Sequence, residues 1–600
     1  MMFLSSLLIA AGLLVAETPD TLQAVTIVAD KGVVVSRTDT LSISNNGTVA
    51  DALLRLPGLG LSDYGGLAGL KGVSLRGLGT AHTDIYLDGV RVSNFQSGQN
   101  DLGMLPLETL GSAVVDYAQN SLSFRTARPV FGGNRAFAGR VSLQAGSFGT
   151  WLPSVRFDVK ASERVSISAH AAGVFTKGNF PYGGGNTLRE DNDLRQLRAG
   201  YDVFGTMTGG EWHIKSFINA SDRGTPGSLS WPSADRQQDK NAVVQGSLRK
   251  AFSELYTLNV SAKGGWDNIY YISEWGNSNY DFTDLQLNTS HTFRLTSWWG
   301  VSLAADIERG TLKASGYDAA RTAAVAALAT AFRLERFKAD LALEYNGTFD
   351  RGAQGLNSLS PSLDLRFTLT KGLDITAFGR RAFRAPTFNE LYYPGYGNPA
   401  LKPEDAWLTG IGLDWHTAFG EAWKLDAKAD FFYNSLKDKI ISAPSEADPY
   451  LWLPYNIGRV EAKGVDVSAA LRYDDGLWTG GMSARYAWQS ALDKTPDSYT
   501  LNQQIPYVAR HTVTLAADIA RAGWCFDALW NWRGGRFDAS GAMPDWNTLD
   551  LTLRKRFTLG GDCALTLFVS AKDLLDCRYE LVRDYPMPGR SVLGGIEFKF

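Results

Sequence analysis

Few side chains in this sequence have both the type and the spacing that chemistry at a site requires. The densest run of oxygen ligands is the segment 190–193, where Asp191, Asn192 and Asp193 could coordinate calcium in an outer loop. A solvated acidic turn is the alternative interpretation of the same run. The six histidines are scattered singly and suggest neither a metal centre nor a general base. We therefore expect no required cofactor, with calcium as the one candidate metal.

The other reactive groups argue against an enzyme. Cys525, Cys563 and Cys577 show no CxxC spacing, which disfavours zinc and a disulfide framework and leaves any pairing among them open. The sequence contains no Gly-x-Ser-x-Gly and no Ser–His or paired-carboxylate pattern. A formal net charge of −3 provides no basic field that would attract nucleic acid. These observations favour a binding or transport protein that is not an enzyme.

From residue 140 to residue 600 the dominant pattern is an alternation with a period of two. Between Trp423 and Tyr433, apolar residues alternate with lysine and aspartate, as in a strand with one apolar and one polar face. Such runs are about 9–11 residues long, the length a tilted strand needs to cross hydrocarbon. Aromatic residues gather at the ends of the apolar face, where they suit the headgroup level. The pattern favours a membrane barrel over a soluble all-β repeat protein, which remains the alternative.

Composition and length agree with one large barrel in outer-membrane lipid. Aromatic residues make up 12% of the chain, charged residues only 20%, and there are 62 glycines. No stretch approaches 18 consecutive apolar residues, so strands would have to cross the membrane. Short turns such as 474–476 alternate with longer segments such as 222–241, which we expect to be outer loops. The final strand ends on Phe600 and resembles the terminal assembly signal of outer-membrane barrels.

The first 138 residues lack the dominant period-two alternation of the rest of the chain. Residues 1–16 contain an apolar run of signal-peptide length, for which a buried core helix is the alternative. Residues 17–39 are expected to form a tether, residues 40–138 a small α+β domain, and residues 139–600 the barrel. Within the α+β domain, the segment 46–57 has the cap and the apolar spacing of an amphipathic helix that stops at Pro57.

Several segments together resemble the TonB-dependent outer-membrane receptor family, and the resemblance covers essentially the whole mature chain. One such motif would be weak, but these stand in the family's order. In the N-terminal domain they are 48–58, 73–77 and 86–90. In the barrel they are 383–386, 389–391, 398–404, 456–458, 464–466, 571–576 and 586–590. Within the family the sequence is most similar to the cobalamin transporters.

The resemblance implies an all-β transmembrane barrel of about 22 antiparallel strands, filled by the N-terminal α+β domain as a plug. An unplugged pore of that width would leak. The resemblance also implies a TonB box, a short strand that pairs with the inner-membrane-anchored TonB protein by β-augmentation. An internally paired plug strand is the alternative for the matching segment. That segment consists of Leu22, Gln23, Ala24, Val25, Thr26, Ile27, Val28 and Ala29.

The departures from the family pattern bear on how the plug is held. Family barrels commonly set two inward carboxylates against two plug arginines. Here the second plug arginine is missing, and the positions we match to the two carboxylates are Thr409 and Asp466. One arginine and one acid are thus absent together, which avoids an unpaired charge in a confined lumen. We hypothesise an Arg76–Asp466 ion pair that holds the plug, the alternative being two separately solvated residues.

The resemblance also bears on the cargo, which in this family is a scarce, bulky nutrient. We expect cobalamin or a related corrinoid, with a ferric siderophore or haem as alternatives. Haem is disfavoured because the segment 387–397 lacks a histidine. Plug apices face the ligand in this family, and aromatic residues among small polar ones suit an apolar face bearing amides. The ligand-binding candidates, each with an ordinary structural role as its alternative, are Tyr64, Asn94, Phe95, Gln96, Tyr392 and Tyr393.

Two further possibilities stay open at this stage. A lipoprotein on the cell surface is a candidate partner that would cap the barrel, and the sequence does not decide it. A passive porin is a less favoured function, because a porin has no use for a plug of roughly 115 residues or for a TonB-box-like strand.

Overall fold

The computed structural model describes residues 38–42, 49–56, 58–132, 135–183, 187–353, 355–445, 451–538 and 540–600. The expected signal peptide, 1–16, and the expected TonB box, 22–29, lie outside these residues, as does nearly all of the tether, 17–39. Among the described residues we find no helix with the length and hydropathy to span a bilayer.

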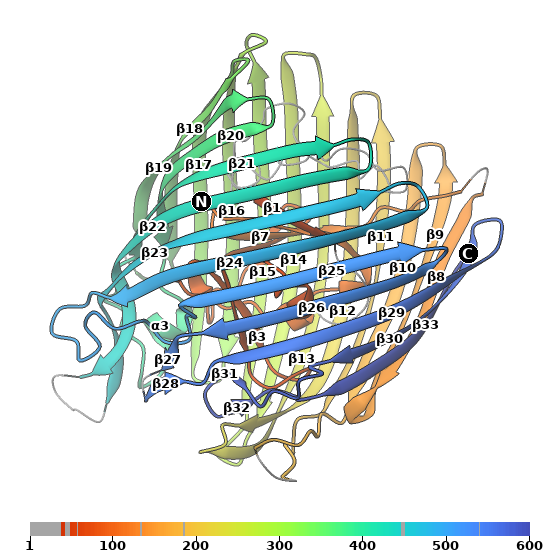
Figure 1. Ribbon diagram of the computed structural model, residues 1–600. Helices are drawn as coiled ribbons and strands as arrows, with labels where there is room; N and C mark the ends of the chain where they lie inside the picture. The colour runs from red at the N-terminus through yellow and green to blue at the C-terminus, as the bar shows by residue number, and fades with distance from the viewer. Residues whose placement is uncertain are drawn as a thin grey trace.

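The fold class expected from the sequence is confirmed. Twenty-two strands, each antiparallel to its neighbours, close into one barrel in which the last strand, β33, pairs with the first, β8 (Figure 1). The barrel starts at Phe137, beside the boundary expected at 138–139. Its strands are β8 (Phe137–Gly146), β9 (Thr150–Ser162), β10 (Val165–Thr176), β11 (Leu194–Met207), β12 (Gly210–Gly227), β13 (Pro232–Ala251), β14 (Tyr256–Ile272), β15 (Ser278–Arg294), β16 (Trp299–Ala314), β17 (Tyr317–Arg333), β18 (Phe337–Asp350), β19 (Leu356–Thr370), β20 (Leu373–Arg384), β21 (Glu404–Phe419), β22 (Trp423–Pro444), β23 (Trp452–Asp474), β24 (Trp478–Asp493), β25 (His511–Arg521), β26 (Trp524–Gly534), β29 (Trp546–Gly560), β30 (Cys563–Lys572) and β33 (Ser591–Lys599).

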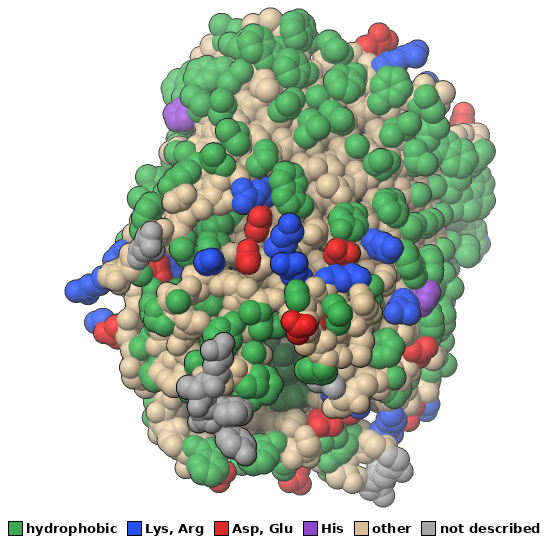
Figure 2. Space-filling model, turned by 90° about the vertical axis from the view of Figure 1, so that its left-hand side faces the viewer, with side chains coloured by type: hydrophobic (Ala, Val, Ile, Leu, Met, Phe, Trp, Pro, Cys, Tyr) green, Lys and Arg blue, Asp and Glu red, His purple; other side chains and the backbone are tan. Residues whose placement is uncertain are grey.

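The alternation along each strand separates an apolar outer face from a polar lumen. On β22, Phe431 is 51% exposed on the outside, whereas its neighbours Asp430 and Phe432 are buried inside. Figure 2 shows the result on one side of the molecule, where hydrophobic side chains cover the upper part of the face. A band of charged side chains crosses the middle of this face, and a hollow opens below the band.

The two ends of the barrel differ, and we call them the turn end and the loop end. At the turn end the connections are short, such as 475–477 between β23 and β24. The loop end carries the long connections 177–193, 385–403, 494–510 and 573–590, which gather at the lower left of Figure 1. The expectation that 222–241 forms a loop is wrong, because β12 and β13 run through it and only 228–231 connect them. These strands, of 18 and 20 residues, extend well past the length that crossing hydrocarbon requires.

The plug lies inside the barrel and is built on a five-stranded sheet in the order β1-β6-β7-β4-β5, with β4 and β7 parallel. Its hydrophobic core includes Leu53, Leu75, Val115 and Phe124, and it extends onto Phe217 of the barrel wall. Of the helix expected at 46–57, the described residues form α2, which ends at Leu53 and is followed by a turn at 54–56. The plug elements are β1 (Thr38–Ser42), α2 (Val49–Leu53), β2 (Leu59–Asp63), β3 (Lys71–Leu75), η2 (Thr80–His82), β4 (Asp84–Leu87), β5 (Val90–Arg91), η3 (Leu102–Met104), η4 (Leu107–Thr109), β6 (Leu110–Asp116) and β7 (Ser121–Thr126).

The connections at the loop end contain short elements of their own. They are η5 (Ser147–Gly149), α3 (Phe388–Tyr392), β27 (Arg536–Asp538), β28 (Gly541–Met543), β31 (Glu580–Val582) and β32 (Tyr585–Pro586). Of these, α3 lies over the plug and takes part in the site described next.

Candidate functional site

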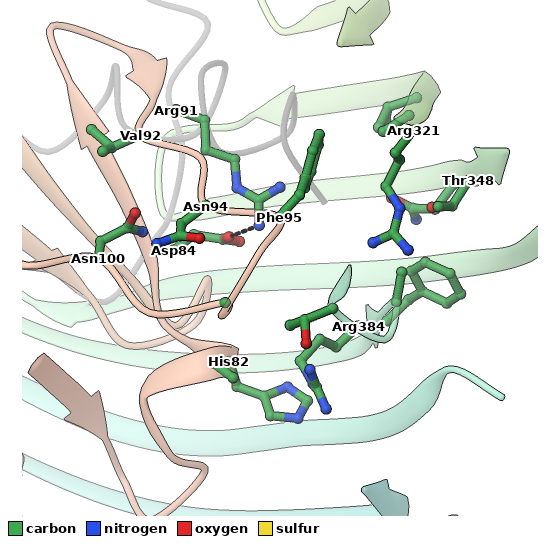
Figure 3. Close-up of a pocket in the computed structure, with 18 of the residues that line it drawn as sticks. His82, Asp84, Arg91, Val92, Asn94, Phe95, Asn100, Arg321, Thr348 and Arg384 are labelled. Atoms are coloured by element: carbon green, nitrogen blue, oxygen red, sulfur yellow. Dashed lines mark ion pairs between the residues drawn. The ribbon is translucent and has the colours of Figure 1, made fainter. Parts of the chain in front are cut away.

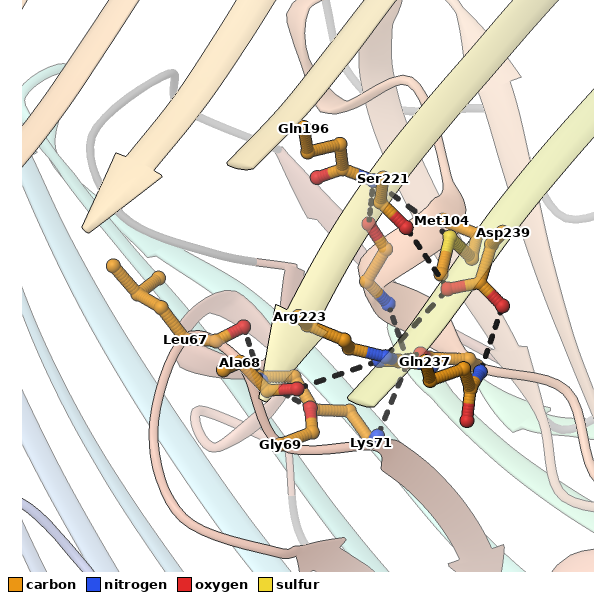
Figure 4. Close-up of polar contacts among 12 residues, drawn as sticks. Leu67, Ala68, Gly69, Lys71, Met104, Gln196, Ser221, Arg223, Gln237 and Asp239 are labelled. Carbon is orange, nitrogen blue, oxygen red and sulfur yellow. Dashed lines mark hydrogen bonds and ion pairs between the residues drawn. The ribbon is translucent and has the colours of Figure 1, made fainter. Parts of the chain in front are cut away.

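Two plug loops reach the loop end, and the first, 63–70, is held rigidly from below. The ammonium group of buried Lys71 donates to the carbonyls of Gly66 and Gly69, and the Gly69 contact measures 2.8 Å. Arg223 on β12 reaches the Ala68 carbonyl at 3.4 Å (Figure 4). Carbonyls turned toward two cations can keep an irregular loop in one conformation, because the buried groups have their partners.

Outer loops cover the tip of this 63–70 loop. The Tyr64 ring meets the Tyr585 ring edge-on, with centroids 4.9 Å apart. Asn192 donates its amide to the Gly65 carbonyl at 2.9 Å from the outer loop 177–193. Burial raises the pKa of the Tyr64 phenol, and the neighbouring tyrosines Tyr585 and Tyr507 raise it further. Tyr64 therefore lies half-buried in a packed seam between the plug and the outer loops.

The second plug loop, 92–100, is joined to the helix α3. The carbonyls of Phe95 and Gln96 accept hydrogen bonds from the amides of Phe388 and Asn389, at 2.7 and 3.0 Å. These are the first amides of α3, which have no partner within the helix itself. The Phe95 ring packs against Phe388 and against Phe282 on β15, with centroids 6.0 and 6.1 Å apart. Plug and barrel are thus joined here by both backbone and aromatic contacts.

Of the other ligand candidates, some side chains already make hydrogen bonds within the protein and one is exposed. The Asn94 side chain closes its own turn by accepting from the amides of Gln96 and Ser97. The Tyr392 hydroxyl donates to Asp350 at 2.8 Å. Tyr393 is 40% exposed, the most open side chain among the six candidates. Of the six, only Asn94 and Phe95 line the cavity described next.

A cavity of about 120 Å³ lies between the 92–100 loop and the barrel wall (Figure 3). Plug residues from η2 and the 92–100 loop line one side, and β17, β18 and the end of β20 line the other. Its charged lining residues are His82, Asp84, Arg91, Arg321 and Arg384. Sequence reasoning did not single out these residues as a group. They come together only through the seating of the plug, although Arg384 and Glu404 do lie within motifs that carried the family resemblance.

A separate contact between plug and barrel is the ion pair of Arg76 and Asp466. Arg76 Nε donates to Asp466 Oδ2 at 3.0 Å, and Nη2 lies 2.9 Å from the same oxygen, off the line of a hydrogen bond. The two residues are only 2% and 4% exposed. The guanidinium also lies over the rings of Tyr117 and Phe432, at 4.4 and 4.7 Å. The ion pair expected from the sequence is present, and its role in holding the plug is our proposal.

Two glycines from the plug motifs allow a close approach of the barrel wall, and one of them lies against this ion pair. Gly58 has φ +63°, and a Cβ there would come within 3.2 Å of both Asp466 oxygens. Gly77 has φ +75°, and a Cβ there would come within 2.8 Å of the Ala491 Cβ. Both positions combine a left-handed backbone with a close approach of the barrel, so a residue without a side chain is needed at each.

We expect Gly58→Ala to weaken plug seating by about 1–2 kcal/mol, from the left-handed backbone alone, with a further loss from displacing the Asp466 carboxylate. The urea concentration that releases the plug would report the change. Gly89→Ala is the matched control, since Gly89 is a plug glycine at φ +81° with nothing within 4 Å of its Cβ position. Equal losses in the two variants would show that the carboxylate contact adds nothing.

The buried carboxylate of Asp101 joins the plug to the barrel wall through Arg223. It accepts from Arg223 at 2.8 Å and from the amides of Lys71 and Gly103. Burial on its own would raise the pKa of Asp101, but Arg223 and Lys71 outweigh burial and hold the pKa below its usual value. A carboxylate with a depressed pKa stabilises the folded state above the unfolded pKa, and this contribution is lost as the pH falls.

We therefore expect plug release to need less urea as the pH falls below about 4, near the pKa of an unfolded aspartate. Asp101→Asn should start from a lower urea midpoint at neutral pH and should lose part of the acid dependence. The measurement is the release midpoint as a function of pH in the wild type and this variant. Parallel curves for the two proteins would contradict the assignment.

The calcium expectation gains no support from the geometry. Both Asp193 oxygens accept from Arg236, at 2.9 and 3.0 Å, and the Asn192 amide is turned to the plug. Within the described ranges, no three His, Cys, Asp or Glu side chains are placed to hold a metal ion. Asn192 instead joins the outer loop to the plug tip.

A closed barrel of 22 strands, with its lumen filled by a plug anchored through buried ion pairs, defines a gated outer-membrane transporter. The chain belongs to the TonB-dependent receptor family. Residues 175–574 match the family described as TonB dependent receptor-like, beta-barrel, and residues 28–128 match the TonB-dependent Receptor Plug Domain. It is therefore an outer-membrane protein of a family of transporters and receptors, and it is not an enzyme.

Among curated relatives, the chain is 23% identical over 592 residues to the vitamin B12 transporter BtuB of Vibrio vulnificus, covering 93% of this chain and 90% of that protein. It is 22% identical over 600 residues to the vitamin B12 transporter BtuB of Photobacterium profundum, covering 92% and 90%. Among solved structures, the FrpB iron transporter of Neisseria meningitidis (F3-3 variant) superimposes with a TM-score of 0.77 at 14% identity, covering 94% and 99%. The copper transporter OprC gives 0.76 at 15% identity, covering 94% and 98%. These two structures establish the fold alone.

Proposed function

We propose that this protein imports cobalamin or a related corrinoid across the outer membrane, energised by TonB. The observation that carries the proposal is the similarity to two vitamin B12 transporters over more than nine tenths of this chain. In outer-membrane barrels the long loops face the cell exterior, so the loop end is where the cargo arrives. The solved structures that share the fold are named for iron, siderophores and copper, which keeps a ferric chelate as the competing cargo.

The site supports a bulky ligand with polar arms. The 92–100 loop presents exposed Ser97 and Gln99, and Tyr393 lies on the neighbouring α3 segment. Such a surface offers an aromatic ring to an apolar face and hydrogen-bonding groups to amides. A surface lipoprotein that caps the loop end remains a proposed partner, and lipid surrounds the exposed apolar wall.

An equilibrium binding panel tests the cargo directly. We expect the purified full-length protein in detergent to bind cyanocobalamin with nanomolar affinity, about −12 kcal/mol. Ferric citrate, a ferric catecholate and haem should bind far more weakly. Tight binding of a ferric chelate, with none of cyanocobalamin, would replace the proposed cargo. Uptake by cells with and without TonB would then show that import, and not binding alone, is energised.

A further inference from the structure

The cavity beside the 92–100 loop resembles an anion site by composition but not by charge. Three arginines, Arg91, Arg321 and Arg384, line a space of about 120 Å³ (Figure 3). Guanidinium groups that converge on a cavity are the usual recognition device for a carboxylate or a phosphate. Whether these three can serve in that way depends on what they already bind.

Arg321 on β17 uses three of its five N–H donors on fixed partners. Its Nε and Nη2 donate to the two oxygens of Asp350 on β18, at 2.7 and 2.8 Å, and Nη1 donates to the Pro386 carbonyl at 2.7 Å. Arg91 is likewise paired, with its Nη2 2.7 Å from Asp84 Oδ1. A bidentate carboxylate is the strongest partner that a guanidinium finds in a protein, so an incoming anion would meet a positive charge that is already neutralised.

Arg384 belongs to a buried chain of charges that crosses from barrel to plug. Its Nη1 and Nη2 donate to the two oxygens of Glu390 on α3, both at 3.1 Å, and Nη2 also contacts Glu404. Glu404 in turn binds His82 of the plug. Around the cavity, four carboxylates face three guanidinium groups and one imidazole. The lining therefore carries no uncompensated positive charge for an anion.

The polar groups that remain available in the cavity are two neutral side chains and one guanidinium nitrogen. Asn100 and Thr348 line the cavity, and within the described ranges neither side chain makes a hydrogen bond. Arg384 Nε is buried there without an acceptor. A carboxamide could offer a carbonyl oxygen to such a donor and N–H groups to the oxygens of Asn100 and Thr348.

We propose that this cavity is a subsite for a neutral carboxamide or hydroxyl arm of the ligand, and that it rejects a carboxylate. The identity of the arm rests on the proposed function, because corrinoids carry carboxamide side chains on their rim. The rejection of anions rests on the charge balance alone. A cavity of about 150 Å³ can hold a benzene molecule, so a space of this size takes one arm and leaves the body of the ligand above, near α3.

Acetamide and acetate form a matched pair for testing the subsite, since they share shape and differ in charge. Saturation-transfer NMR titrations on the full-length protein in detergent would give their affinities, and crystal soaks would locate them. We expect acetamide to bind in the cavity, with acetate weaker by about tenfold or more, because an added carboxylate would meet like charges. Asp350→Asn removes the negative charge that faces Arg321, and it should raise acetate affinity by about tenfold.

Asp340→Asn is the matched control variant. Asp340 pairs with Arg333 at 2.6 Å at the turn end of the same strand, β18, so its replacement should leave both probes unchanged. If Asp350→Asn fails to assemble, the wild-type comparison of the two probes decides the question. Acetate binding as tight as acetamide, or no binding of either probe in the cavity, would overturn the proposal. Acetamide selectivity without any cyanocobalamin binding would instead refute the proposed cargo and leave the subsite standing.

Discussion

Alanine in place of Asp466 is expected to release the plug at a much lower urea concentration than the wild type requires. The substitution leaves the Arg76 guanidinium buried between Tyr117 and Phe432 without its carboxylate. Removing one partner of a buried ion pair costs about 3–5 kcal/mol, most of which reflects the charge left behind. In planar lipid bilayers the plugged wild type should be nearly silent, and urea-induced conductance would report release of the plug.

Two further variants separate the ion pair from a general loss of packing. Asp430 stands opposite Asp466 in register and lies 4.0 Å from Arg76 Nη2, so Asp430→Asn should shift the midpoint far less. Arg76→Met combined with Asp466→Leu removes both charges, and it should recover part of the lost stability. If Asp466→Ala shows urea-induced conductance at the same urea concentration as Asp430→Asn, the ion pair does not hold the plug.

The barrel could be predicted from the sequence because the alternating pattern that indicates it is present within each strand. Every second side chain of a strand such as β22 meets lipid, so alternation is written into each segment independently. The ends of strands are not marked in this way. Beyond the hydrocarbon, both faces of β12 and β13 meet water or protein, and the apolar alternation that would identify them weakens. For that reason the segment 222–241 was expected to be a loop.

The site could be predicted only where a motif fixes both partners. Arg76 and Asp466 lie in recognisable segments, and their charges had to balance in a narrow lumen. The chain from His82 through Glu404 to Arg384 spans 322 residues between its first two members and depends on how the plug is rotated in the barrel. The rotation of the plug within the barrel cannot be predicted from a sequence pattern. Phe95 and Tyr392 both contact the barrel in the structure, and their contact with a ligand stays a prediction.

Two of the attachments between the plug and the wall differ in how they lie relative to the proposed ligand surface. One is the Arg76 pair with β23, and the other is the junction of η2 and the 92–100 loop with β21 and α3. The second place adjoins the surface that we propose for the ligand, whereas the first does not. Cargo that engages Tyr393 or the cavity would therefore act on one attachment only, and opening the passage requires that force reach the other as well.

Proline in place of Val25 is expected to reduce uptake to the level of cells that lack TonB while leaving ligand binding unchanged. The segment 22–29 is our proposed TonB box, and it must pair as an added strand. Proline removes a backbone N–H and disrupts such pairing, whereas Val25→Thr keeps the β-branched shape and should transport normally. Radiolabelled cargo uptake, beside equilibrium binding on the purified protein, measures the two properties separately. Because the outer membrane has no ATP, a receptor that cannot be pulled should bind its cargo and retain it at the surface. Normal uptake by Val25→Pro would place the TonB contact elsewhere in the chain.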